Sequence, residues 1–144
     1  MALRAKRPRH ILFLCVANSA RSQMAEGIAR SLAPQGVKVS SAGSSPASVR
    51  PQAVQVLKEI GIDISVHQSK ELDSIDTGSV DTVITLCAEE VCPVFLGKAH
   101  RLQWGLPDPA TVTGTEEIRL NAFRSVRDEL LRRLRVLFGH GEDA

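Results

Sequence analysis

The chain has 144 residues, of which 43% are hydrophobic and 24% charged, a balance typical of one globular domain. The longest apolar run, Ile11 to Ala17, is too short to cross a bilayer, which takes about 20 residues. The 18 basic and 16 acidic side chains leave a net charge of only +2, and aromatic residues are scarce, so neither a membrane nor a nucleic acid is expected as a partner.

We expect a single domain over residues 10–139. Residues 1–9 are basic and aperiodic, and they are predicted to form a disordered leader; residues 140–144 are predicted to form a disordered tail. No apolar segment with a cleavage site follows the start, so export is not expected.

Extended and helical patterns alternate along this domain. The predicted strands are apolar runs bounded by turn residues: His10–Cys15, Val37–Ser41, Val80–Leu86 and Arg101–Trp104. Two predicted helices carry apolar side chains at helical spacing, over residues 22–34 and 51–61. Pro51 suits the first position of the second helix and Gly61 suits its end. A short helix is expected near Lys70–Leu72.

The last helix is the longest. Thr113 and Glu116 have the spacing of a capping box and predict its start, and Gly139 predicts its end. One face of this helix is apolar and is formed by Leu120, Phe123, Val126, Leu130, Leu134 and Leu137.

This order of elements predicts an α/β fold, with a four-stranded, mostly parallel sheet and helices on both faces. In such sheets, ligands bind beyond the carboxyl ends of the strands. Cys15 and Cys87 both fall at the ends of predicted strands, so the sequence places a candidate site there.

The chain has three cysteines: Cys15, Cys87 and Cys92. An odd, low count without an export signal argues for reduced thiols in the cytoplasm and against a structural disulfide framework. Burial as small hydrophobic side chains is the alternative interpretation, but the neighbours of these residues favour chemistry.

The segment from Cys15 to Ser22 joins the first strand to the first helix, and its C-x5-R pattern predicts an oxyanion-binding loop. Such a turn presents unpaired backbone N–H groups at a helix N-terminus. Arg21 adds a planar, two-pronged donor, and a cysteine at this positive end is expected to be partly thiolate. Ser22 can donate to that thiolate, and Asn18 tolerates left-handed backbone. The other loop residues are Val16, Ala17, Ser19 and Ala20.

The segment LFLCVANSARSQMAEG, residues 12–27, resembles the thioredoxin-coupled arsenate reductases, which share the fold of low-molecular-weight protein tyrosine phosphatases. One departure is Ala17, where glycine is usual, so the backbone there is expected to avoid a conformation that only glycine adopts. The resemblance continues at residues 41–43, 63–65 and 85–87, at Trp104, at Asp108-Pro109 and at AFRSVRDEL, residues 122–130.

The resemblance implies reduction of arsenate to arsenite, an activity of arsenic resistance and detoxification. Cys15 would attack the arsenic of an oxyanion held by the loop and Arg21, with Asp108 as the general acid. Cys87 would then attack Cys15, and Cys92 would exchange into that disulfide. An external thiol donor, of the thioredoxin, glutaredoxin or another type, would reduce the final bond. By sequence alone, Asp108 is equally well an ordinary turn residue.

Two extra thiols favour a reductase over a phosphatase, which needs only Cys15, Arg21 and Asp108. The related reductases separate the resolving pair by more residues than Cys87 and Cys92 are separated here. An intact helix would hold Cα atoms five residues apart at about 8–9 Å, whereas a disulfide needs about 4.4–6.8 Å. The segment is therefore expected to bend, and Pro93 favours a break.

Several alternatives remain at this point. Cys87, Cys92 and His100 suggest a zinc site that lacks a fourth ligand, and the chain as a whole suggests a small-molecule or tyrosyl phosphatase, or a non-catalytic oxyanion or metalloid sensor. The histidines His10, His67 and His140 are expected to be structural or solvated, and Trp104 is expected to pack near the site.

A bound metal is not expected either. Relatives can bind potassium near the loop asparagine, and Asn18, Glu26 and Ser41 match that pattern. Lys70, however, occupies the place of a further acidic ligand, so we expect no cofactor, with potassium left as an open alternative.

Overall fold

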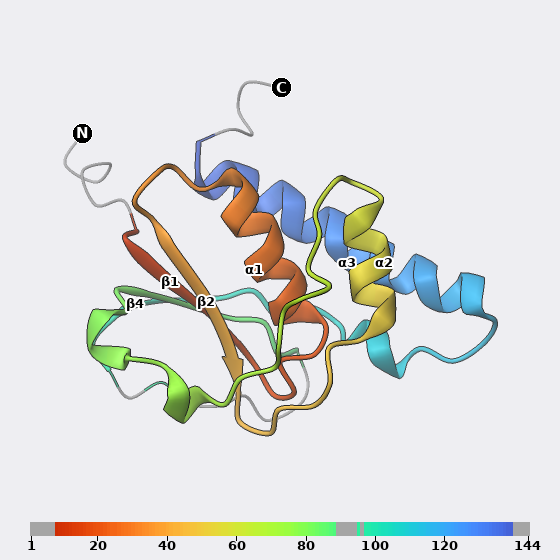
Figure 1. Cartoon of the computed structure of the whole chain (residues 1–144), viewed down its shortest axis with the longest axis horizontal. Helices are drawn as coiled ribbons and strands as arrows, with labels where there is room; N and C mark the ends of the chain where they lie inside the picture. Colours follow the sequence, from red (N-terminus) through yellow and green to blue (C-terminus); the bar gives the residue numbers. More distant parts are fainter. Residues whose placement is uncertain (1–7, 89–94, 96, 140–144) are drawn as a thin grey trace.

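A computed structural model describes residues 8–88, 95 and 97–139, and Figure 1 shows its sheet flanked by helices. The four strands are β1 (His10–Cys15), β2 (Lys38–Gly43), β3 (Thr82–Thr85) and β4 (His100–Gln103). They pair in the order β2-β1-β3-β4, and every pair is parallel. The predicted single α/β domain with a four-stranded sheet is confirmed. Most of the predicted leader and the whole tail, residues 1–7 and 140–144, lie outside the described residues.

Strand β1 is the centre of the sheet because it is apolar on both faces and lies between β2 and β3. Ile11, Phe13 and Cys15 face the larger core, whereas Leu12 and Leu14 face a smaller one. A strand buried on both sides needs a continuous apolar run, which is what the sequence shows.

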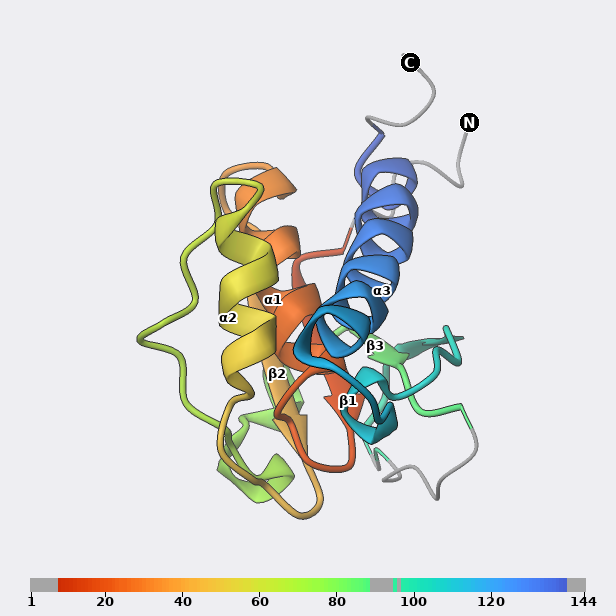
Figure 2. The ribbon, with the colours of Figure 1, turned by 90° about the vertical axis from the view of Figure 1, so that its right-hand side faces the viewer.

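Three α-helices cover one face of the sheet, as Figures 1 and 2 show: α1 (Arg21–Leu32), α2 (Pro51–Lys58) and α3 (Glu116–Leu137). The predicted apolar face of α3 is buried, apart from a half-buried Leu137, and packs on this core. In the described part of the chain, the other face carries only short 3-10 helices, η2 (Leu72–Ser74) and η3 (Thr77–Ser79), together with buried Phe95. Helical cover on both faces is therefore present but unequal.

Two local predictions need correction. Helix α3 is capped by Thr115, whose side chain accepts a hydrogen bond from the Ile118 N–H at 3.2 Å, and not by Thr113. Gly114 lies between the two threonines at φ +128°, a left-handed conformation that separates Thr113 from the helix. The short helix expected near Lys70–Leu72 begins only at Leu72, because Glu71 instead extends beside Gly43 in an isolated parallel bridge.

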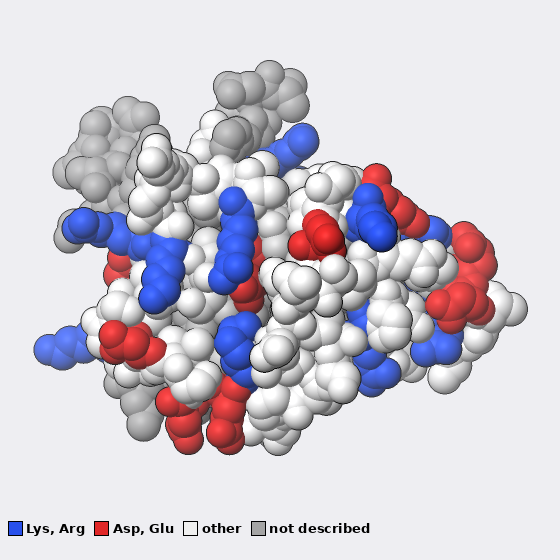
Figure 3. Space-filling view, viewed as in Figure 1, with Lys and Arg blue, Asp and Glu red and all other residues white. Residues whose placement is uncertain are grey.

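None of the described helices is long and apolar enough to cross a membrane. Figure 3 shows basic and acidic side chains interspersed over the face viewed in Figure 1, without a broad field of either sign. This distribution agrees with the small net charge of the sequence.

His10 begins β1 and is buried, with only 4% of its surface exposed. Its Nδ1 lies 2.9 Å from Ser79 Oγ and its Nε2 lies 2.9 Å from Ser40 Oγ, so both ring nitrogens have partners. Burial lowers the pKa of His10 below its ordinary value of 6.5, and the nearby positive charge of Lys38 acts in the same direction.

We expect this histidine to make the fold sensitive to mild acid. The unfolded chain binds a proton at His10 more readily than the folded chain does, so the free energy of unfolding should fall as the pH drops below about 6.5. Urea unfolding near pH 7.5 and near pH 5.5 measures this loss for the wild type and for His10→Gln. The variant should lose less stability between the two conditions. An equal loss in both proteins would contradict the assignment.

Candidate active site

The loop between β1 and α1 has its carbonyl oxygens bonded on the outside. Backbone N–H groups of the segment at residues 45–50 donate to three of them at 2.9 Å each: Ser45 to Val16, Ala47 to Ala17 and Arg50 to Ser19. The Asn18 carbonyl accepts from the Ser69 hydroxyl at 2.8 Å. In a planar trans peptide, the N–H that follows each carbonyl points the opposite way. The N–H groups of residues 17–20 are therefore directed into the loop, which makes it a cradle for an anion.

Gly43, the last residue of β2, allows this arrangement. A Cβ atom at this position would lie 2.3 Å from the Val16 carbonyl oxygen and 3.0 Å from the Asn18 nitrogen. Only a residue without a side chain lets the strand approach the loop backbone so closely.

Cys15 ends β1 at the base of the cradle, and its Sγ lies 3.0 Å from Ser22 Oγ. Asn18 Nδ2 donates to the same Ser22 oxygen at 2.7 Å, which leaves the serine hydrogen free to point at the sulfur. Asn18 has φ +49° and is the only non-glycine residue with positive φ in the described part of the chain. Ala17 thus avoids a left-handed backbone, as expected.

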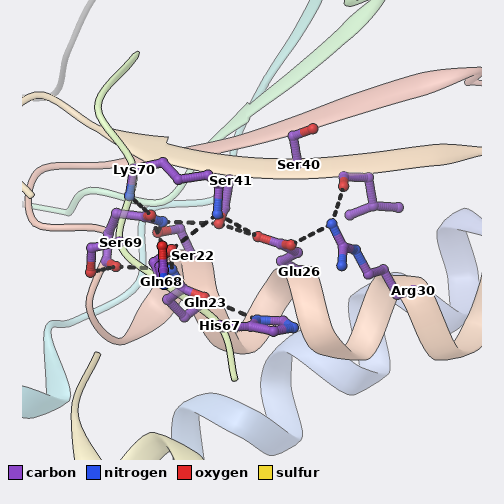
Figure 4. A network of polar contacts seen from close by, with 12 residues as sticks. Ser22, Gln23, Glu26, Arg30, Ser40, Ser41, His67, Gln68, Ser69 and Lys70 are labelled. Carbon is purple, nitrogen blue, oxygen red and sulfur yellow. Dashed lines mark hydrogen bonds and ion pairs between the residues drawn. The ribbon is translucent and has the colours of Figure 1, made fainter. Parts of the chain in front are cut away.

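A buried polar network supports Asn18 from behind, and Figure 4 shows its members around Glu26. Asn18 Nδ2 also donates to Ser41 Oγ at 2.9 Å, and the Ser41 hydroxyl donates to Glu26 Oε1. Glu26 is 2% exposed and contacts two cations, Arg30 Nη2 at 2.7 Å and Lys70 Nζ at 3.5 Å. The three residues that match a potassium pattern therefore lie together, with an ammonium group beside them.

His67 joins the same network from the side, because its Nδ1 lies 3.1 Å from Gln23 Oε1. Gln23 Nε2 donates to Asn18 Oδ1 at 3.0 Å, so its amide oxygen faces the imidazole. Burial lowers the pKa of His67, and the cations of Arg30 and Lys70 add to this effect while Glu26 opposes it. A neutral ring that donates from Nδ1 fits this place.

Arg21, at the start of α1, contacts the segment after β3 and the turn that contains Asp108. Its Nη1 donates to the carbonyl oxygens of Leu86 at 3.3 Å and Leu106 at 2.9 Å. Leu86 directly precedes Cys87, and Leu106 lies two residues before Asp108. Its Nη2 lies 3.7 Å from Asp108 Oδ2, while Asp108 Oδ1 accepts from the Ala110 N–H at 3.0 Å. The arginine and the aspartate thus face each other, and the second carboxylate oxygen fixes the turn.

These groups surround a cavity of about 200 Å³, smaller than the roughly 300–1,000 Å³ typical of drug-sized ligands. It is lined by Cys15, Val16, Ala17, Ser19, Ala20, Arg21 and Asp108. The cavity holds a thiol, a guanidinium and a carboxyl group at a ring of backbone donors. It suits a small tetrahedral oxyanion, and none of the described residues that line it is aromatic.

Cys87 follows β3 and is buried in the same core as Cys15. It is disulfide-bonded, whereas Cys15 is a free thiol; Cys92 lies outside the described residues. Among the described residues, no group of three His, Cys, Asp or Glu side chains could hold a metal ion, so the zinc alternative gains no support there. His100 is exposed on β4, and His140 lies outside the described part.

Trp104 is half-buried and packs against the larger core, with the Arg133 guanidinium 5.7 Å from its ring centroid. It is absent from the cavity lining, so its position is one of packing beside the site.

The sequence analysis missed the outer supports of the cradle. Ser45, Ala47 and Arg50 act through backbone N–H groups, which leave no trace in residue type. Gly43 was the one available signal, because a glycine that ends an otherwise buried strand indicates a close backbone approach.

Comparison with known proteins places these features in context. The family profile described as low molecular weight phosphotyrosine protein phosphatase matches residues 10–142. An arsenate reductase of Bacillus subtilis is 45% identical over 127 residues, which cover 87% of this chain and 91% of that protein. An arsenate reductase of Halalkalibacterium halodurans is 42% identical over 134 residues, covering 92% and 96%.

Solved structures of arsenate reductases are also similar to this chain. An arsenate reductase in a phosphate-binding state superposes with a TM-score of 0.79 at 33% identity, covering 91% of this chain and 97% of that one. A thioredoxin-dependent arsenate reductase of Corynebacterium glutamicum has a TM-score of 0.60 at 32% identity, covering 92% of this chain and 64% of that one.

Substitution of Gly43 tests the cradle geometry. Gly43→Ala should push Val16 and the loop away, lower the free energy of unfolding by about 1–3 kcal/mol and weaken the binding of inorganic phosphate. Gly78→Ala is the matched control, because a Cβ there would meet only the Asp76 side chain at an ordinary distance of 3.4 Å. Isothermal titration with phosphate and urea unfolding give the two measurements. Unchanged phosphate binding by Gly43→Ala would contradict the geometry.

Proposed function

The chain belongs to the low molecular weight phosphotyrosine protein phosphatase family, and from this premise we propose that it is an arsenate reductase that uses Cys15 as its nucleophile. The observation that carries the proposal is a free Cys15 thiol in an oxyanion cradle, with Cys87 at the end of the neighbouring strand. The arsenate reductases that are 42–45% identical over most of the chain support the same assignment.

In the first step, the Cys15 thiolate attacks arsenic and a water molecule leaves. The N–H groups of residues 17–20 and the Arg21 guanidinium hold the oxyanion, and the Ser22 hydroxyl stabilises the thiolate. Asp108 faces Arg21 across the cavity and donates the proton that the departing oxygen needs. The product is a covalent Cys15–arsenic adduct, still at the As(V) level.

In the second step, the Cys87 sulfur attacks the Cys15 sulfur. A Cys15–Cys87 disulfide forms, the sulfur–arsenic bond breaks, and its electron pair leaves with arsenic as arsenite. The position of Cys87 supports this pairing. Leu14 is in register with Thr85, the last residue of β3, and the Leu86 N–H donates to the Leu14 carbonyl, so Cys87 follows β3 one residue beyond the position opposite Cys15.

A strand separation of about 4.8 Å and a rise of about 3.3 Å would put two such Cα atoms about 5.8 Å apart, within the range of about 4.4–6.8 Å that a disulfide requires. Successive side chains of a strand point to opposite faces, so the backbone at Cys87 has to depart from strand geometry beyond β3 for its sulfur to face Cys15. The burial of both cysteines in the same core supports such an approach.

In the third step, Cys92 attacks Cys87 and releases the Cys15 thiol, and an external dithiol reduces the Cys87–Cys92 bond. In the structure, Cys87 is disulfide-bonded and Cys15 is a free thiol, which are the states expected of these two residues after this step. We infer a thioredoxin-type donor, since a structural neighbour at 32% identity is thioredoxin-dependent. We propose a cytoplasmic location as well, because a relay that starts from reduced thiols fits a reducing compartment.

We propose that no metal ion or organic cofactor takes part. The Glu26 carboxylate, which would be the charged ligand of a potassium ion beside Asn18 and Ser41, already contacts Arg30 and Lys70. An additional cation would have to displace an ammonium group that the chain supplies itself, so these residues do not fit a potassium site.

Arsenite production, measured with thioredoxin, thioredoxin reductase and NADPH beside the hydrolysis of p-nitrophenyl phosphate, tests the proposal. We expect arsenite formation at equal rates in potassium and sodium buffers. Phosphate release should be slow, because the described lining of the cavity includes no aromatic side chain for an aryl ester. Rapid phosphate release without arsenite would instead assign the chain as a phosphatase.

Cys92→Ser tests the relay. Without the last thiol, the variant should produce about one arsenite per chain and stop as a Cys15–Cys87 disulfide. Peptide mapping after thiol blocking, without reduction, identifies the bridge, and wild type treated without a donor is the control. Sustained turnover of Cys92→Ser with thioredoxin would rule out the three-cysteine relay.

Asp108→Asn tests the general acid. The amide retains an oxygen that can accept from Ala110, so phosphate binding should change little. The first step should slow by about 10²–10⁴-fold, because the amide cannot supply the proton. Single-turnover formation of the first disulfide measures this rate, and an unchanged value would leave Asp108 as a turn residue.

A further inference from the structure

We propose that Lys70 is a positioning residue for Cys15. It acts at a distance, through Asn18 and Ser22, by fixing which way the Ser22 hydroxyl points. The inference rests on the proposed function in one respect, namely that Cys15 is the nucleophile.

Four residues close a ring of polar contacts behind the cradle, and Figure 4 shows Glu26, Ser41 and Lys70 within it. The Lys70 backbone N–H donates to Asn18 Oδ1 at 2.7 Å, and Asn18 Nδ2 donates to Ser41 Oγ at 2.9 Å. The Ser41 hydroxyl donates to Glu26 Oε1, and Lys70 Nζ lies 3.5 Å from that same oxygen. Lys70 therefore holds the ring at two points, one by its backbone and one by its charge.

The ring gives the Asn18 carboxamide one orientation. Its oxygen accepts from the Lys70 N–H and from Gln23 Nε2, so a flipped amide would set its NH2 group against two donors. In the observed orientation, Nδ2 donates to Ser22 Oγ, and the serine hydrogen is left for Cys15 Sγ at 3.0 Å. The Ser22 hydroxyl therefore points at Cys15 Sγ because the Lys70 N–H fixes the orientation of the Asn18 amide.

The charge of Lys70 matters because Glu26 is only 2% exposed. A buried carboxylate that loses a cation moves toward its remaining partners, and such a movement of Glu26 displaces the Ser41 hydroxyl that already donates to it and that the ring needs in place. Arg30 does not substitute for Lys70. It pairs with the other oxygen, Oε2, and donates to the Val39 carbonyl, so it lies outside the ring.

This difference provides a matched pair of variants, Lys70→Gln and Arg30→Gln, each of which removes one cation from the same carboxylate. Both are made in a Cys87→Ser/Cys92→Ser background, where Cys15 is the only thiol, and alkylation by iodoacetamide is followed across pH. Lys70→Gln should slow alkylation at neutral pH by about three- to tenfold and move its pH profile upward, because the thiolate loses a directed donor. Arg30→Gln should stay within about twofold, and Lys70→Arg should recover most of the rate.

An unchanged alkylation rate in Lys70→Gln would overturn the proposal. Equal slowing by both glutamine variants would overturn it too, because the rate would then depend on the total positive charge near Glu26 and not on the ring. Ser41→Ala opens the same ring without removing a charge, so it keeps the test decisive should Lys70→Gln fail to fold. It should slow alkylation as Lys70→Gln does, and an unchanged rate would equally overturn the proposal. Alkylation needs no arsenate, so this test is independent of the arsenite assay. If the variants show the expected alkylation rates but the wild-type chain forms no arsenite, the proposed function is rejected and the positioning role of Lys70 is not.

Discussion

The outward bonding of the loop carbonyls is the constraint on which the site depends. An isolated strand-to-helix turn has no reason to direct consecutive amides inward. Here, backbone donors from the segment after β2 hold the carbonyls of Val16, Ala17 and Ser19, so peptide planarity sets the direction of the N–H groups. The attraction for an anion is therefore built from main chain, and Arg21 adds the formal positive charge. The segment reaches the loop only because Gly43 lets β2 approach it.

A second layer of polar side chains acts on the nucleophile. Cys15 contacts Ser22, Ser22 contacts Asn18, and Asn18 is fixed by groups that come from α1, from β2 and from the residues around Lys70. Such a network specifies one arrangement only when every member is satisfied. Among the described residues, no buried side-chain nitrogen or oxygen lacks a partner, which agrees with a preorganised site.

The parts of this molecule that the sequence could predict are those with local signals. A buried central strand shows as a continuous apolar run, and the position of Asn18 in a tight loop shows in its tolerance of positive φ. The contacts of Lys70 and of the residue 45–50 segment join positions far apart in the chain, and no spacing rule predicts them. The wrong cap at Thr113 has a local origin instead. Its spacing to Glu116 fits a capping box, but the left-handed Gly114 moves the helix start to Thr115.

The position of Cys87 separates two kinds of chemistry in the fold. The cradle, its supports and Arg21 form one unit around α1 and β2, whereas Cys87 comes from the end of β3 and touches this unit through the Leu86 carbonyl that Arg21 holds. In the proposed relay, electron transfer is thus added at the rim of the cavity without altering the groups that form the cradle. A fold arranged in this way can gain or lose redox activity by changes in one loop. The division between hydrolases and reductases within such a family is therefore a narrow one, and it can be crossed in either direction.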